Sequence, residues 1–217
     1  MNARYSTQRD RQSWLIKTAV IALAGVCSFI LPLVVLADVP LVQLEKDIGE
    51  LTTILDDQEY RKTHTKDELK QKLIETAENR FNWEEIAKRS LGLYWKDRTE
   101  EEQKEFTLLL KDLLISSYLD KIIDNYSGEK ILFDKEVLKG DRAYIEFRII
   151  NKAETSISLG ARMIQEKEQW MIYDLVIEGV SSVKNYRVQF YDIIRQSSYE
   201  ELKKKLQEKV KALKEEK

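Results

Sequence analysis

The stretch YDLVIEGVSSVKNYRVQF, from Tyr173 to Phe190, decides the fold of this 217-residue chain. Its first residues alternate as in a β-strand, and Gly179 separates them from a pattern with helical spacing. Alternation predicts one strand face made of Met171, Tyr173, Leu175 and Ile177. Helical spacing predicts one helix side made of Val183, Tyr186, Phe190 and Ile193. Taken alone, the stretch is a core strand followed by a covering helix, with no obvious nucleophile or metal ligand.

The residues before this stretch also alternate with a period of two from Lys130 onward. The pattern predicts strands near 130–138, 142–150, 154–165 and 169–178, with tight turns at 139–141 and 166–169. Their apolar positions fall on one side: Ala143, Ile145, Phe147, Ile149, Ile157, Leu159, Ala161 and Met163. These strands predict an antiparallel meander with one apolar face that helices must cover.

Helical patterns occupy the rest of the chain. Residues 41–58 place apolar side chains on one helix face, and Thr65 with Glu68 begins a second helix. Asn82 caps a short helix that ends at Gly92, and Thr99 with Glu102 caps a long helix that ends near 127–128. The last segment carries a narrow apolar stripe and is expected to pack on the body of the protein. The fold class is therefore α+β, a curved antiparallel sheet of about four strands covered by helices.

The N-terminus has the features of an export signal. Four basic residues precede an apolar run from Thr18 to Ala37, and Val35-Leu36-Ala37 resembles a small-x-small cleavage site. We expect residues 1–37 to be a cleavable signal peptide and residues 38–217 to form a single domain. The alternative is an uncleaved membrane anchor, because about 20 apolar residues can span a bilayer. Val26 before Cys27 argues against a lipoprotein.

The composition of residues 38–217 excludes several kinds of function. They contain 32 basic and 37 acidic residues, a net charge of −5, which argues against nucleic-acid binding. Cys27 is the only cysteine, so the domain has no disulfide and no cysteine nucleophile or metal ligand. The single histidine, His64, falls in a polar turn, and all seven glycines are isolated. No metal or cofactor is expected.

An enzyme of the ketosteroid-isomerase type would need a buried acid that faces a tyrosine. Asp174 beside Tyr173 is the candidate pair, but strict alternation places the two side chains on opposite faces of the strand. The sequence therefore argues against an enzyme. A membrane-anchored adaptor protein remains the other alternative if the N-terminal segment is retained.

Several segments together resemble the MlaC family of periplasmic phospholipid-binding proteins, also known as toluene-tolerance auxiliary proteins. These segments are YDLVIEGVSSVKNYRVQF itself, RFNWEEIAKRSLGLYWKDRTEEEQKEF from Arg80 to Phe106, YSGEKI from Tyr126 to Ile131, and WMIYD from Trp170 to Asp174. They occur in the order and spacing of that family, and the resemblance extends over about residues 45–210.

The resemblance implies a soluble phospholipid carrier in the periplasm of Gram-negative bacteria. Such carriers pass lipid between an outer-membrane lipoprotein complex and an inner-membrane ABC transporter with its lipid-binding ring protein. The acyl tails are expected in an apolar cavity between sheet and helices, and the head group near solvent. A shuttle of this kind works as a monomer, which we expect here. The absence of obvious catalytic residues from the stretch Tyr173 to Phe190 is then expected, since a site for acyl tails needs only a cavity from which water is excluded.

The inward positions of the predicted sheet and helices are the expected lining of the cavity. From the strands these are Ile145, Phe147, Leu159, Met163, Tyr173, Leu175 and Ile177, and from the helices Leu113, Tyr118, Val183 and Tyr186. Each of them is equally consistent with plain core packing. Gly160-Ala161 departs from the family, in which larger or more polar residues are expected, and such small side chains would widen the pocket or loosen the sheet.

Overall fold

The computed structural model of the protein describes residues 39–215. The predicted signal peptide lies outside the described residues. The helices and 3-10 turns are α2 (Pro40–Asp56), α3 (Gln58–Thr63), α4 (Lys66–Ala77), η1 (Glu78–Arg80), α5 (Trp83–Leu91), η2 (Gly92–Asp97), α6 (Glu100–Asn125), α7 (Ser182–Gln196) and α8 (Tyr199–Glu215). Within this range, no helix is long and apolar enough to cross a bilayer.

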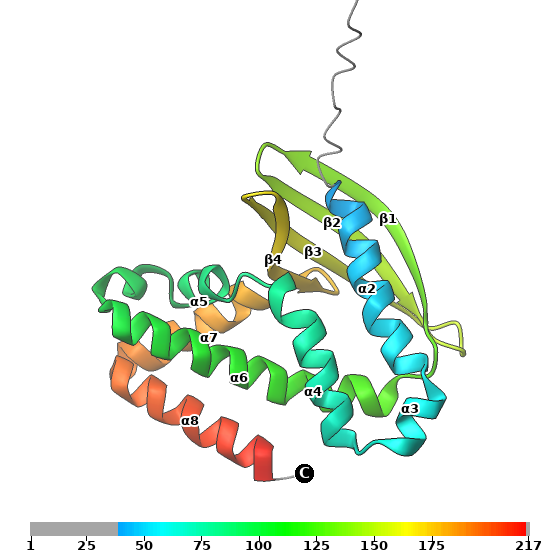
Figure 1. The fold of residues 1–217 in the computed structure, drawn as a ribbon. Coiled ribbons are helices and arrows are strands. Elements are labelled where there is room, and N and C mark those ends of the chain that lie inside the picture. The colour runs from blue at the N-terminus through cyan, green and yellow to red at the C-terminus, as the bar shows by residue number, and fades with distance from the viewer. Residues whose placement is uncertain (1–38, 216–217) are drawn as a thin grey trace, which may run out of the picture. The chain divides into compact units, whose positions relative to one another are not determined.

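The strands form one open antiparallel sheet in the order in which they occur along the chain (Figure 1). They are β1 (Lys130–Lys139), β2 (Arg142–Ile150), β3 (Ser156–Glu166), β4 (Gln169–Ile177) and β5 (Val180–Ser181). The α+β class and the predicted meander are confirmed. The sheet has five strands rather than about four, because the two residues of β5 fold back onto Val176 and Ile177 directly before α7.

The predicted helix starts are confirmed by their capping bonds. Thr65 and Glu68 form a reciprocal capping box at α4, and Thr99 and Glu102 form another at α6. The Asn82 side chain accepts a hydrogen bond from the backbone N–H of Glu85 and begins α5. These local bonds fix where α4, α5 and α6 begin (Figure 1).

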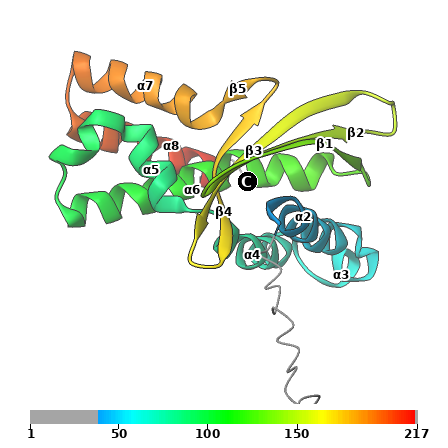
Figure 2. The same cartoon turned by 90° about the horizontal axis from the view of Figure 1, so that it is seen from above.

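The two faces of the sheet pack against different helices. Figure 2 shows α2 and α7 on opposite sides of the sheet. On the α2 side lies a group of buried residues that we call the sheet cluster: Leu44, Ala143, Ile145, Phe147, Ala161, Met163, Trp170 and Ile172. On the other side α5, α6, α7 and α8 enclose the helix cluster: Ile86, Ala87, Leu91, Trp95, Phe106, Leu110, Leu113, Tyr173, Val183, Phe190, Tyr199, Leu202, Leu206 and Val210. The last helix packs on the body as expected, through Leu202, Leu206 and Val210.

A β-bulge corrects the predicted face of β4. Met163 pairs with Ile172 and Arg162 pairs with Asp174, so Tyr173 is an extra residue on β4. As a result Ile172 and Leu175 face the sheet cluster, whereas Tyr173 belongs to the helix cluster. The prediction that Met171, Tyr173, Leu175 and Ile177 share one face was therefore wrong, because it assumed unbroken alternation.

Candidate functional site

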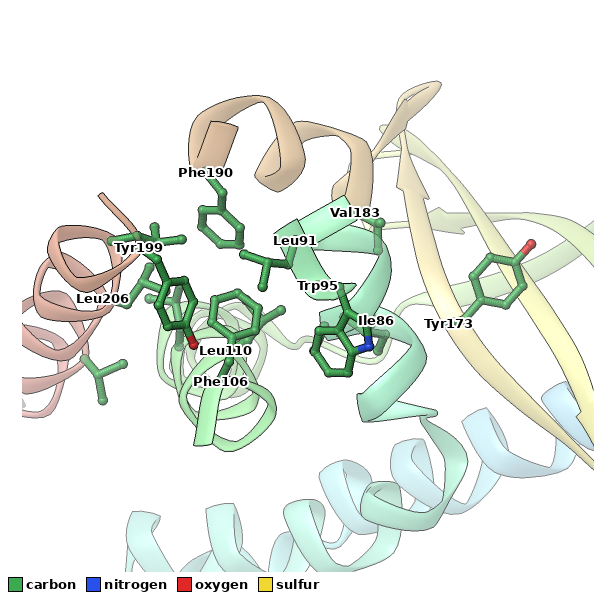
Figure 3. Close-up of a cluster of buried hydrophobic side chains, with 14 residues drawn as sticks. Ile86, Leu91, Trp95, Phe106, Leu110, Tyr173, Val183, Phe190, Tyr199 and Leu206 are labelled. Atoms are coloured by element: carbon green, nitrogen blue, oxygen red, sulfur yellow. The ribbon is translucent and has the colours of Figure 1, made fainter. Parts of the chain in front are cut away.

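The predicted lining residues lie in two groups rather than one. Five strand residues pack in or against the sheet cluster: Ile145, Phe147, Leu159, Met163 and Leu175. Four others lie in or against the helix cluster: Leu113, Tyr173, Val183 and Tyr186. Figure 3 shows that Tyr173 stands on its strand apart from the helical members of the cluster, with its hydroxyl directed away from them. The single lining surface read from the sequence is thus divided between the two faces of the sheet.

The remaining two predicted residues, Tyr118 and Ile177, are partly open to solvent. The side chain of Ile177 is 36% exposed, and its neighbour across the sheet, Leu159, is half-buried. Tyr118 on α6 is 43% exposed and is hydrogen-bonded to the hydroxyl of Tyr186 on α7. Burial raises the pKa of the Tyr186 phenol, and the neighbouring Tyr118 raises it further, so the Tyr186 hydroxyl stays neutral at physiological pH.

The apolar face of the sheet is only partly covered within the described residues. Ile145 and Met163 at its centre are fully buried under α2. Toward the start of β3 and the end of β4 the same face opens, and Ile157 is 47% exposed. This face therefore runs from a closed apolar interior to an open apolar edge.

Gly160 does not widen a pocket on this face. It lies on the opposite face, where a Cβ would come within 2.5 Å of the Tyr144 ring. Tyr144 therefore covers the position that a side chain would fill, and the next residue, Ala161, is fully buried in the sheet cluster. The expectation that these small residues loosen the sheet receives no support from this packing.

A side-chain amide joins α2 to the edge of the sheet. Gln43 donates from Nε2 to the Trp170 carbonyl at 2.6 Å, and its Oε1 accepts from the Trp170 N–H at 2.9 Å. The backbone N–H of Leu41 also donates to Glu136 on β1, at 3.0 Å. Together with Leu44 and Ile48, these bonds hold α2, the helix that closes the apolar face within residues 39–215.

The face opposite α2 carries a polar cleft of about 320 Å³, which we call the cationic cleft. Its lining comes from α5, β3, β4 and the start of α7: Arg89, Arg162, Tyr173, Asp174, Ser181, Val183, Lys184 and Arg187. Asp174 is buried at its base. One carboxylate oxygen accepts from Arg162 and Ser181, and the other accepts from the backbone N–H of Val183.

The cationic cleft corrects the expected separation of Tyr173 and Asp174. Because of the β-bulge, both residues line the same cleft instead of opposite faces. The Tyr173 ring lies under the Arg89 guanidinium, at 4.3 Å, while all bonds of Asp174 go to Arg162, Ser181 and Val183. The carboxylate is therefore engaged in holding β3, β4 and α7 together rather than aimed at the tyrosine.

A second cleft, of about 270 Å³, lies between α4, α6 and α8 and is lined in part by Lys70, Ile74, Lys111 and Leu119. Lys70 at its side is paired with Asp120 at 2.7 Å. Ligand pockets for drug-sized molecules occupy about 300–1,000 Å³. Both clefts are at or below the small end of that range, so neither holds two acyl chains.

Known proteins are similar to this chain in sequence and in fold. The sequence model of the MlaC protein family matches residues 45–208. The "Intermembrane phospholipid transport system binding protein MlaC" of Haemophilus influenzae is 25% identical over 132 residues, which cover 58% of this chain and 61% of that protein. The chain thus spans about three fifths of the length of this curated relative.

The fold is similar to that of a solved phospholipid-binding protein from Ralstonia solanacearum, determined in complex with a phospholipid. The two structures align with a TM-score of 0.68 and 20% sequence identity, over 80% of this chain and 98% of the other. This likeness shows a shared fold. The family match extends from the first described helix to the last and includes each segment on which the resemblance rested. The chain belongs to the MlaC protein family.

Proposed function

We propose that this protein binds a diacyl phospholipid and carries it through the periplasm between the outer and inner membranes. The observation that carries the proposal is the apolar face of the sheet, which is buried at Ile145 and Met163 but open at Ile157 and Ile177. Among the helices that the structure describes, α2 covers its buried part. Family membership supports the assignment, and the related proteins from H. influenzae and R. solanacearum are named for phospholipid transport and phospholipid binding.

In this proposal the acyl chains enter at the open edge of the apolar face and run along Leu159 and Leu175 toward Met163. They take the place of side chains that α2 now contributes, so α2 must move away from the sheet. The contacts of Gln43 with Trp170 and of Leu41 with Glu136 are the polar links that this movement breaks. The lipid cavity is therefore formed on loading, which agrees with the small volume of the two clefts.

Burial of the chains is sufficient to keep lipid in water. Each methylene removed from water contributes about 0.8 kcal/mol, so two chains of roughly fifteen methylenes have a ceiling of about 24 kcal/mol. That ceiling exceeds the roughly 18–21 kcal/mol at which noncovalent complexes saturate. A membrane offers the chains nearly the same environment, so the free energy of net transfer is small. Direction is then set by partners that open the cavity or compete for the lipid.

The partners proposed for such a carrier are an outer-membrane lipoprotein complex and an inner-membrane ABC transporter with a lipid-binding ring protein. Residues 1–37 are proposed to direct export and to be cleaved. The proposed cycle has no covalent step, since lipid is bound and released unchanged, and it needs no cofactor.

Uptake of phospholipid from vesicles tests the proposal. The protein is mixed with phosphatidylethanolamine vesicles, separated from them, and assayed for bound phosphorus. We expect about one phospholipid per protein chain, and we expect Leu159→Asp to abolish uptake because a carboxylate then lies on the apolar path.

The matched control is Leu93→Asp, which adds the same charge at a position that is 77% exposed. It should leave uptake unchanged, and circular dichroism should show that both variants are folded. Equal uptake by folded Leu159→Asp and Leu93→Asp would contradict a binding path along this face.

A further inference from the structure

We propose that the cationic cleft is a binding site for a phosphate group. It lies between α5, the β3–β4 pair and the first turn of α7. Figure 2 shows α7 on the side of the sheet opposite α2. Four cationic side chains from three elements line it, namely Arg89, Arg162, Lys184 and Arg187, and the lining contains one carboxylate, Asp174.

Asp174 does not neutralise this group of cations. Its two oxygens already accept three hydrogen bonds, and the only cation among the donors is Arg162. The bond from Arg162 uses a single Nη1–H, at 2.8 Å, although a guanidinium offers five donors in a planar fork. The Arg162 side chain is 43% exposed. It is therefore fixed at one end and has donors left for an anion in the cleft.

Two further cations of the cleft have no carboxylate partner in residues 39–215. Arg187 uses its Nε–H for the carbonyl of Arg89 at 2.6 Å, which fixes the side chain and leaves its terminal nitrogens without an ion pair. Lys184, one turn earlier on α7, makes no ion pair with the described residues. Arg89 itself is held by Glu85 and by the ring of Tyr173.

This concentration of positive charge is local, since residues 38–217 carry a net charge of −5. Arginine binds phosphate well because its planar donors match two phosphate oxygens at once. The cleft holds about 320 Å³, enough for one anionic group but not for a folded acidic segment of another protein. A phosphate group is thus the ligand that the charge, the donor geometry and the size favour together.

Beside Asp174 at its base, the cleft is also lined by two largely apolar side chains. Tyr173 and Val183 line the cleft and also belong to the helix cluster. A phosphate could come from a lipid head group, which rests on the proposed function, or from free inorganic phosphate, which does not. The two sources need separate arms of one experiment.

In the first arm, inorganic phosphate is titrated into the lipid-free full domain at low ionic strength and followed by NMR shifts of the backbone amides. Saturable shifts are expected at Ser181–Arg187. The double variant Lys184→Gln/Arg187→Gln should bind phosphate at least about tenfold more weakly, because charge-assisted hydrogen bonds are lost. The control double variant Lys204→Gln/Lys209→Gln removes two exposed cations from α8 and should bind as the wild type does.

In the second arm, the same variants take up lipid from vesicles that contain either phosphatidylglycerol or diacylglycerol with identical acyl chains. If the cleft holds the head-group phosphate, the wild type prefers phosphatidylglycerol, and Lys184→Gln/Arg187→Gln loses this preference while it still binds diacylglycerol. If the cleft binds free phosphate and not the head group, the variant loses the NMR shifts caused by phosphate but takes up both lipids as the wild type does.

Absence of saturable phosphate shifts in the wild type would overturn the proposal, and so would equal phosphate affinity in the cleft variant and the α8 control. Failure of all lipid uptake would instead overturn the proposed function, and the phosphate arm would still decide whether the cleft is an anion site.

Discussion

Asp174 shows how one buried carboxylate can fix a local arrangement. It accepts hydrogen bonds from a neighbouring strand through Arg162, from β5 through Ser181 and from the start of α7 through the Val183 N–H. The same carboxylate therefore closes the β4–α7 turn and holds an arginine of the cationic cleft in place.

Replacement of Asp174 by asparagine should lower the free energy of unfolding by about 2–3 kcal/mol, because the buried amide keeps the shape but loses charge-assisted bonds. The measurement is urea unfolding at pH 7. The matched control is Asp134→Asn, which breaks the exposed pair of Asp134 with Arg148 on the same sheet. Solvent screens that pair, so the control should cost clearly less, and equal losses would contradict the role of Asp174.

Gly92 occupies a backbone conformation that other residues avoid. Its φ is 57° and its ψ is −121°, and a Cβ there would overlap the hydroxyl of Tyr191. That hydroxyl accepts a hydrogen bond from the Leu93 N–H at 2.7 Å, which links η2 to α7.

Gly92→Ala should therefore destabilise the domain by about 2 kcal/mol or more, from backbone strain together with displacement of Tyr191. Gly140→Ala is the comparison, because Gly140 also has a positive φ, of 58°, but has open space at its Cβ. Thermal unfolding of both variants measures the difference. A Gly140→Ala variant as unstable as Gly92→Ala would show that Tyr191 contributes nothing.

The structural role of a single residue could be predicted from the sequence only where that role depends on nearby residues of the chain. The caps Thr65, Asn82 and Thr99 could be read from their neighbours three residues on. The β-bulge at Tyr173 could not, because an extra residue in a strand leaves the chain locally extended and changes only its pairing with Arg162 and Met163. Every error on β4 follows from that bulge, including the separation of Tyr173 from Asp174.

At the scale of whole elements, the free edge of β4 is covered by other segments of the chain. Three different segments cover its backbone groups: Gln43 bonds Trp170, the N–H of Asn82 bonds the Ile172 carbonyl, and β5 pairs with Val176 and Ile177. An uncovered strand edge would offer a site for pairing with another chain. The contact of Gln43 with Trp170 comes from α2, the helix proposed to move.

Gln43→Ala tests the link between α2 and the sheet. Loss of both hydrogen bonds to Trp170 should lower the free energy of unfolding by about 1–3 kcal/mol. If movement of α2 admits lipid, the same variant should load and release phospholipid faster in a vesicle transfer assay. Glu45→Ala, on the exposed side of α2, serves as the control. Unchanged transfer rates in a destabilised Gln43→Ala variant would contradict a gating role for α2.

A second link joins α2 to η1 through Asp47 and Arg80, which lie 3.0 Å apart. Burial raises the pKa of the Asp47 carboxyl above its ordinary value, while the charge of Arg80 opposes that rise. For an acid with a raised pKa, the folded state holds the proton more tightly, and stability falls as pH rises through that pKa.

Arg80→Gln should raise the pKa of Asp47 further and extend this loss to higher pH. The variant should therefore be closer to the wild type at acidic pH, where Asp47 is protonated, than at about pH 7, where a buried carboxylate is left without its partner. Urea unfolding at the two pH values measures the difference. If Arg80→Gln lowers the free energy of unfolding equally at both pH values, ionisation of Asp47 is not the cause of the loss.

At the scale of the molecule, the sequence was sufficient for the fold class, the order of the meander and the packing of the last helix. The apolar stripe Leu202, Leu206 and Val210 predicted the docking of α8, which the structure confirms. The division of the apolar residues between two faces was not predictable in the same way. Alternation shows that Ile145 and Tyr173 point away from solvent, but only the three-dimensional pairing shows that they point to opposite sides.

The same division gives the molecule two surfaces of different character. The side under α2 is apolar and opens toward Ile157 and Ile177, while the side under α7 carries the cationic cleft. A carrier needs a dry volume for acyl chains and contact with solvent for a head group, and the first of these surfaces supplies the dry volume in the proposed function.

Native mass spectrometry of the protein purified from the cells that express it tests the central claim most directly. The account predicts a mass excess of one diacyl phospholipid per chain, which is released on denaturation and identified by lipid extraction. Unloaded protein that also takes up no phospholipid from vesicles would contradict the account.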